Sequence, residues 1–461
     1  EEMKNSKWLL PLLGIGILVG AFFLARKNPT PPKSPPETRQ ETVKEESPSL
    51  PEEKISETKR KEPDPPHAEE ATYTRYDSII DRLLIAVRSW DKEQIRKVLD
   101  DLLALITPEP IPDHQNSAIL YREAFDKLSP LTDEEKAAQE ALQSGKPLTE
   151  AEKELLRVYL DKNRSVIELI GEGSQRPGCN FNVQWKDGFG SELPHISEII
   201  QLQNLVLLDA NLGEGKTSAR SAEIAALLGD SLKSEPAIVS QLVQSRCISE
   251  SHTLLQENWD PAGYGALLET GLGNRDFGKG IQLGILGELH ASTRLFIENI
   301  SENTGVPDPS KNQNWANDLE ILTRLYQDIY TLTPQPYHEI SEELSRIENR
   351  IKTAPQYAEI TKQMFPSIGR IFQNMAKSEA ITATQRIALA LSEHRSEQGS
   401  YPTSLEQIKS IAPGLMQDPF TGQPYKYRRE GNGFVLYSVG SDGLDNGGNS
   451  QEEDIIFRIG N

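Results

Sequence analysis

The chain has 461 residues, enough for two or three domains, and its hydrophobic fraction of 36% is low for a globular protein. With 49 Lys+Arg against 69 Asp+Glu, the formal net charge of −20 repels a phosphate backbone, so nucleic acid is not an expected partner. Only two cysteines are present, which excludes a disulfide-rich scaffold and a zinc cluster. Cys179 and Cys247 either form one disulfide outside the cytoplasm or are two separate buried thiols.

Residues 8–24, WLLPLLGIGILVGAFFL, carry no charge and are flanked by Lys7 and by Arg26-Lys27. The run meets the lower limit of about 17–25 residues for a membrane span, is long for a signal-peptide core, and is followed by no A-x-A cleavage site. The sequence therefore predicts an uncleaved, single-pass signal-anchor in residues 1–27. Its flanking charges alone favour a cytoplasmic C-terminal part, although long domains often translocate regardless of charge.

Residues 28–71 consist mainly of Pro, Glu, Lys, Ser and Thr. Such a composition cannot bury enough apolar surface to offset the entropy of ordering. The segment is therefore predicted to be a disordered linker between the anchor and the folded part.

Residues 72–378 are predicted to form a helical domain built as an irregular stack of helical hairpins. Apolar residues recur at helical spacing in Ile79–Val87 and, after a predicted break near Ser89-Trp90-Asp91, in Ile95–Leu105. Thr132-x-x-Glu135 and Thr149-x-x-Glu152 match capping boxes. No fixed repeat period supports a tetratricopeptide array. Further helices are predicted at His195–Asn211, Ala219–Leu232, Ala237–Asn258, Ile281–Asn299, Trp315–Leu332, Glu339–Ile351 and Ala358–Met375.

The segment Ala210–Thr217, ANLGEGKT, approximates a phosphate-binding loop, but alanine replaces its first glycine. The apolar residues in Ile196–Leu208 before it have helical spacing, whereas a phosphate-binding loop follows a strand. A helix–turn–helix hairpin explains the same residues, so no nucleotide is expected.

Residues Gly263–Gly287 are rich in glycine but contain no G-x-G-x-x-G motif, and the chain has no H-E-x-x-H or G-x-S-x-G motif. The sequence thus favours a non-enzymatic protein with no catalytic residues and no bound cofactor apart from a metal ion. The alternative is an enzyme of the hydrolase class with its site in this glycine-rich region.

The C-terminal residues 379–461 have a different pattern. A helix from Ile381 ends near Gly399, a turn at Asp418–Tyr425 leads into a short strand, and further strands are predicted at Phe434–Ser438 and Ile455–Ile459. The intervening loop, rich in glycine and side-chain oxygen, suits a cation that needs 6–8 oxygen ligands. An EF-hand is disfavoured, because Leu444 occupies a ligand position and strands flank the loop.

From Glu379 onward the chain resembles the globular domain of major pseudopilins of type II secretion. The resemblance rests on Gly399–Thr403, on Asp418-Pro419 with Gly422-x-Pro424-Tyr425-x-Tyr427-Arg428, on Leu436–Gly443 and on Asp454-Ile455. It implies a structural calcium ion that fixes the last strand. The ligands that it implies are Asp442 and Asp454, with Asp445, Asn446 and the Val439 carbonyl as further members.

Pseudopilins also carry a cleavable N-terminal motif followed by a glutamate, which is absent here, so polymerisation into a pseudopilus is not expected. The segments Asn116–Phe125, Cys179–Trp185 and Ser240–Val243 resemble uncharacterised envelope-associated proteins of planctomycete-type bacteria with the same tail.

Together these features predict a mainly α protein with a small C-terminal α+β module. It is expected to be anchored in a bacterial inner membrane by residues 8–24, with its soluble part in the periplasm and a protein partner in the cell envelope.

Overall fold

The computed structural model describes residues 68–213, 216–257, 259, 261–262, 265, 276–298, 313–365, 368–408, 415–449 and 454–460. Residues Ile79–Asn461 belong to one compact unit. Of the other unit, Ser6–Ser78, the structure describes only residues 68–78, which are the first half of one helix. The predicted anchor at residues 8–24 lies outside the described residues, as does most of the predicted linker. Among the helices that are described, none is both long and apolar enough to cross a membrane.

The described part is mainly helical and carries one small antiparallel sheet, which confirms the predicted fold class. Its α-helices are α2 (Ala68–Arg88), α3 (Lys92–Ile106), α4 (Ser117–Lys127), α5 (Asp133–Gln143), α6 (Glu150–Lys162), α7 (Arg164–Gly173), α8 (Pro194–Leu212), α9 (Lys216–Asp230), α10 (Ile238–Glu257), α12 (Phe277–Glu298), α13 (Gln313–Leu332), α14 (Tyr337–Lys352), α15 (Glu359–Met364) and α16 (Ile368–Gln398). Short 3-10 turns lie at η2 (Asp113–Gln115), η3 (Trp185–Gly190) and η6 (Leu405–Ile408).

Local capping fixes several helix starts. Thr132 and Thr149 each accept a hydrogen bond from the amide three residues later, while Glu135 and Glu152 accept from the threonine amides, so both predicted capping boxes are confirmed. The predicted break after α2 also occurs, because Asp91 Oδ1 accepts from the first amides of α3 at 3.0 and 3.1 Å.

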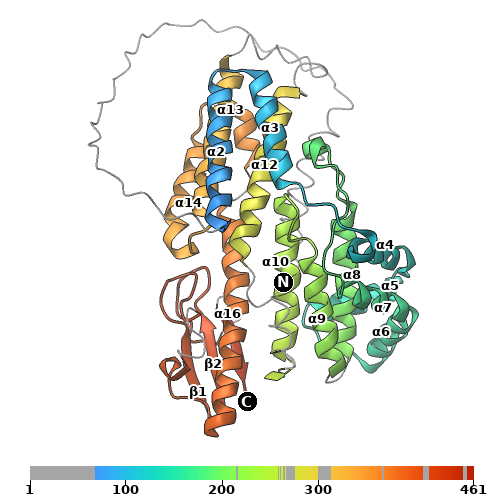
Figure 1. Ribbon diagram of the computed structural model, residues 1–461. Helices are drawn as coiled ribbons and strands as arrows, with labels where there is room; N and C mark the ends of the chain where they lie inside the picture. Colours follow the sequence, from blue (N-terminus) through green and yellow to red (C-terminus); the bar gives the residue numbers. More distant parts are fainter. Residues whose placement is uncertain are drawn as a thin grey trace, which may run out of the picture. The chain divides into compact units, whose positions relative to one another are not determined.

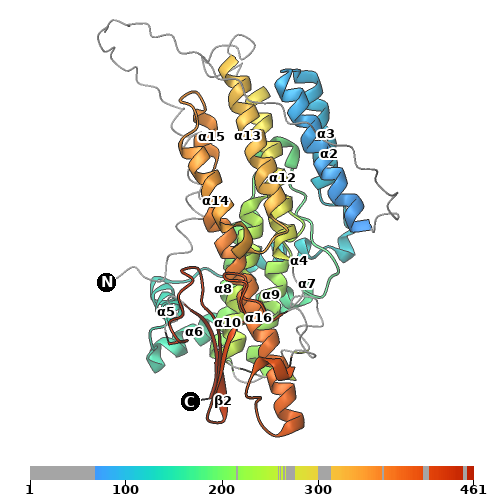
Figure 2. The ribbon, with the colours of Figure 1, turned by 90° about the vertical axis from the view of Figure 1, so that its left-hand side faces the viewer.

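Several helices that are consecutive in the sequence lie side by side, as expected for a stack of hairpins (Figures 1 and 2). Helix α9 packs between α8 and α10, and α4 packs against α7. Helix α12 packs against both α10 and α13, and α3 lies along α12. Helices α9 and α12 thus bury apolar residues against neighbours on two sides.

Close packing of α12 on the start of α10 explains several glycines of the region that the enzyme alternative invoked. A Cβ added at Gly287 would lie 1.7 Å from the Pro236 carbonyl oxygen, and one at Gly284 would lie 3.1 Å from the Ile238 amide nitrogen. Only a residue without a side chain allows this helix-to-backbone approach. These positions therefore serve packing, while most of residues 263–275 lie outside the described residues.

The same contact places Glu288 of α12 at the first turn of α10, where its carboxylate accepts a hydrogen bond from the Ile238 amide. Desolvation raises the pKa of Glu288 to about 7, and Tyr326 lies within its electrostatic reach. The surroundings therefore disfavour the ionised form, so that the acid stays largely protonated up to about pH 7.

We predict that Glu288→Gln removes part of the pH dependence of stability. Because the pKa is higher in the folded than in the unfolded protein, the protonated acid stabilises the fold fully below about pH 4.5, and this stabilisation disappears as the pH rises through 7. Urea titrations at pH 5.5 and pH 8 should show that the gain of the variant over wild type is about 1–3 kcal/mol larger at pH 8 than at pH 5.5. Exposed Glu393→Gln is the control, and equal shifts for both variants would contradict the prediction.

Helix α16 departs from the predicted boundaries. The predicted helix Ala358–Met375 is divided into α15 and α16, with Phe365 in an extended conformation before Pro366. By contrast, no break occurs near Met375, because residues 377–398 contain neither proline nor glycine. The predicted domain boundary at 378/379 thus falls inside one continuous helix, which runs from α14 to the sheet (Figure 1).

The sheet has the order β1-β2-β3 and consists of β1 (Lys426–Glu430), β2 (Gly433–Ser438) and β3 (Ile455–Ile459), all antiparallel. Phe434, Leu436 and Phe457 are fully buried in one apolar cluster with Leu391 of α16. The sheet therefore rests on the second half of α16, and the turn and strands predicted for this region are confirmed.

Candidate functional site

The three segments singled out in the helical domain converge in space. Asn116, which caps α4, exchanges two 2.9 Å hydrogen bonds with the backbone of Asn180. Arg122 of α4 donates to the Phe181 carbonyl oxygen and lies over the Phe181 ring. Phe181 in turn stacks on His195 of α8, with ring centroids 4.3 Å apart. Residues distant in sequence thus build one polar cluster around the buried ring of Phe181.

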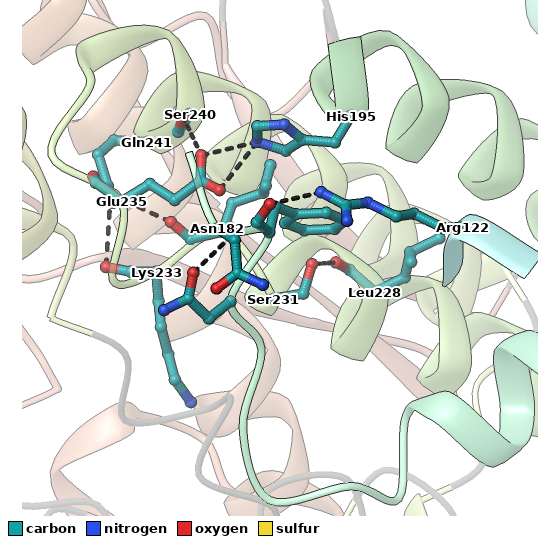
Figure 3. Close-up of polar contacts among 12 residues, drawn as sticks. Arg122, Asn182, His195, Leu228, Ser231, Lys233, Glu235, Ser240 and Gln241 are labelled. Atoms are coloured by element: carbon teal, nitrogen blue, oxygen red, sulfur yellow. Dashed lines mark hydrogen bonds and ion pairs between the residues drawn. The ribbon is translucent and has the colours of Figure 1, made fainter. Parts of the chain in front are cut away.

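Glu235 lies at the centre of this cluster, in the connection between α9 and α10 (Figure 3). His195 Nε2 lies 2.8 Å from Glu235 Oε1 and 3.1 Å from Oε2, and the Ser240 hydroxyl donates to Oε2 at 2.6 Å. Gln241 Nε2 donates to the Glu235 carbonyl oxygen at 2.7 Å and lies near the carbonyls of Leu232 and Lys233. The cluster therefore ties the α9–α10 connection to α8.

The order of these contacts does not correspond to a nucleophilic triad. A catalytic serine donates to a histidine that an acid orients, whereas here the carboxylate lies between Ser240 and His195 and bonds both. His195, Glu235 and Ser240 are also at most 5% exposed. The cluster is suited to fixing the helices in position.

The two cysteines are free thiols in this structure. Burial beside Ser117 and Ser231 raises the pKa of Cys179 to about 12, and complete burial raises the pKa of Cys247 further. Neither thiol is ionised near neutral pH, so neither has the character of an activated nucleophile.

Sequence reasoning named Ser240 and Gln241 only as part of a resemblance and did not identify His195 or Glu235. The two residues are separated by 40 positions and have no motif spacing. The only local signal is an ionisable residue beside a proline near the start of a helix, as in Pro194-His195 and Glu235-Pro236.

The predicted metal site lies in the loop that joins β2 to β3. Its most informative residue is Asp454, which is 2% exposed at the start of β3. Asp454 Oδ2 accepts a 2.9 Å hydrogen bond from the Gly448 amide, whereas Oδ1 is buried without a hydrogen-bond partner. A buried carboxylate oxygen without a partner is costly, and a cation beside it would compensate the charge.

A second predicted ligand, Asp445, lies near the same side of the sheet. Tyr437 donates to Asp445 Oδ1 at 2.8 Å, and Asp454 lies within electrostatic reach of the same phenol. Asp445 Oδ2 is 3.4 Å from Lys426 Nζ on β1. The Tyr437 and Gly447 hydrogen bonds, with Lys426, hold the pKa of Asp445 below its usual range.

Two of the remaining predicted ligands are engaged within their own turn. Exposed Asp442 accepts from the Leu444 amide at 3.0 Å, and Asn446 lies 3.5 Å from the Leu444 carbonyl oxygen. Val439, whose carbonyl was the predicted ligand, is held through its amide, which donates to Asp418 at 3.0 Å. Among the described residues, no three His, Cys, Asp or Glu side chains are gathered closely enough to hold a metal ion together. Asp445 and Asp454 therefore share one environment with Tyr437, while Asp442 and Asn446 bond within their own turn.

Two arginines hold this loop against the sheet. Arg428 and Arg458 are the register partners of Val435 on either side of β2. Their guanidinium groups donate to the carbonyls of Gly447 at 2.6 Å and Gly448 at 2.9 Å. A Cβ at Gly448 would lie 3.0 Å from Val435 Cγ1, so glycine allows the loop backbone to lie directly on β2.

Asp418, quoted only for the resemblance, has a structural role in the same module. Its carboxylate is 2% exposed and accepts from the Phe420 amide, the Ser438 hydroxyl and the Val439 amide at 2.9–3.0 Å. It therefore ties the turn before β1 to the end of β2.

The segment that resembles a phosphate-binding loop follows a helix, as predicted. Leu205–Leu208 lie inside α8, and α9 begins at Lys216.

No protein-family model, curated protein or solved structure matches the chain.

Proposed function

We propose that this protein is a non-enzymatic scaffold whose C-terminal module binds a structural calcium ion beside Asp454. The single observation that carries the proposal is Asp454 Oδ1, a buried carboxylate oxygen without a hydrogen-bond partner. The adjacent loop supplies Asp445 and further side-chain oxygens, which are ligands that calcium prefers. An ion there would link the loop to Asp454, the residue directly before β3.

The scaffold part of the proposal is supported by the buried cluster around Glu235. Its polar side chains bond one another and the backbone, and it connects α4, α8, α9 and α10. Such a cluster rigidifies a helical stack that could present a surface to a protein partner in the cell envelope.

Anchoring through residues 8–24, with the soluble part in the periplasm, completes the proposal. It is supported by the uncharged apolar run and by the calcium-binding module, since calcium is more plentiful outside the cytoplasm. A reporter fused near Glu69 tests it, because a cytoplasmic signal from that fusion would contradict the periplasmic location.

Isothermal titration calorimetry of the protein with calcium tests the metal site directly. We expect one calcium ion per chain and much weaker binding of magnesium, which demands tighter octahedral geometry. Absence of calcium binding at millimolar concentration would overturn the proposal.

The variant Lys426→Met tests whether Asp445 is one of the calcium ligands. The Lys426 ammonium competes with a cation for Asp445, which lies 3.4 Å away. Since an exposed ion pair contributes about 0.5–1 kcal/mol, its removal should lower the calcium Kd about two- to fivefold. Lys136→Met, an exposed lysine of α5, is the matched control. An unchanged or higher Kd for Lys426→Met would remove Asp445 from the ligand set.

A further inference from the structure

Strand β3 is held from two sides by different parts of the molecule. At its N-terminal end, Asp454 bonds the Gly448 amide of the loop. On its outer edge, Gln256 Nε2 of α10 donates to the Ile456 carbonyl oxygen at 3.1 Å. β3 is an edge strand, and Gln256 gives one of its backbone carbonyls a side-chain partner from α10.

Aromatic packing reinforces the contact between β3 and the residues after α10. Trp259 lies edge-on to Phe457 with ring centroids 4.9 Å apart, and its Nε1 donates to Ser392 of α16 at 3.3 Å. Phe457 also stacks on Phe434 of β2. The C-terminal end of α10 is thus bound to both the sheet and α16.

From this arrangement we infer that calcium binding at Asp454 strengthens the attachment of α10 to β3. We call the contacts Gln256–Ile456 and Trp259–Phe457 a calcium-dependent clasp, because they join the C-terminal sheet to the helical domain. The inference rests on the proposed calcium site. An ion that holds Asp454 favours the conformation in which β3 is paired, and only a paired β3 presents Ile456 and Phe457 to Gln256 and Trp259. Calcium and α10 therefore bind the same state of the strand.

The size of the effect follows from linkage. At a free calcium concentration a hundredfold above Kd, the equilibrium for opening of β3 falls about a hundredfold if opening releases the ion. The coupling is reciprocal, so a variant that removes the α10 contact must weaken calcium binding by the same factor by which calcium strengthens that contact.

Hydrogen–deuterium exchange of the whole protein, with calcium or with chelator, tests the inference. We expect calcium to slow amide exchange, by up to about a hundredfold, both in β3 and in the last turns of α10 from Ser251. Asp454→Asn should abolish both effects. Gln256→Met should retain slower exchange in β3, lose much of the effect in α10 and raise the calcium Kd, whereas exposed Thr253→Ala should resemble wild type.

Two other results have distinct meanings. If calorimetry shows calcium binding and β3 exchange slows while exchange in α10 is unaffected, the clasp is wrong and the calcium site stands. If calorimetry shows no calcium binding, both the proposed function and the clasp are wrong.

Discussion

Replacement of Glu235 by alanine is expected to lower the free energy of unfolding by about 3–5 kcal/mol, the usual loss when one member of a buried polar pair is removed. His195 and Ser240 would both lose their acceptor, in a place where each is at most 2% exposed and water cannot replace it. The α9–α10 connection would also lose its link to α8. Urea unfolding followed by circular dichroism measures the change.

The matched control is Glu168→Ala, an exposed glutamate on α7, which should change stability by less than about 0.5 kcal/mol. A double-mutant cycle with His195→Ala separates the direct contact from general disruption. We expect a coupling energy of about 1–3 kcal/mol between the two positions. Additive effects would mean that His195 and Glu235 do not interact in solution.

The second large effect is expected at Asp454. In wild type, calcium at a hundredfold excess over Kd should raise the free energy of unfolding by about 2.7 kcal/mol relative to chelator. Asp454→Asn keeps the size of the side chain and an oxygen that can accept from Gly448, but it removes the negative charge. The calcium-dependent gain should therefore fall below about 0.5 kcal/mol in this variant.

Thermal melts of wild type, Asp454→Asn and the exposed control Asp126→Asn, each with calcium and with chelator, measure this difference. Asp442→Asn belongs in the same series, because the resemblance makes Asp442 a ligand while its Oδ1 bonds only within its own turn. Loss of the calcium effect in Asp442→Asn would make it a ligand in the bound state. A calcium response in Asp454→Asn equal to that of wild type would exclude Asp454.

Local signals in the sequence determined much of the secondary structure. The capping boxes at Thr132 and Thr149, the break at Asp91, the turn at Asp418 and the last two strands were all predicted from neighbouring residues. These features depend on hydrogen bonds or periodicity within a few positions, so the information is contained in one short segment.

Only the tertiary structure determined which distant residues meet. His195 and Glu235 have no shared motif, and their contact follows from the packing of α8 beside the α9–α10 connection. The glycines of α12 belong to no sequence motif, and the close approach of Pro236 and Ile238 to this helix explains them. The resemblance implied Asp454 as an oxygen ligand, but its buried and unpartnered Oδ1 depends on how the loop folds over β2. Long-range packing decides such features, because burial and the choice of partner belong to the whole fold.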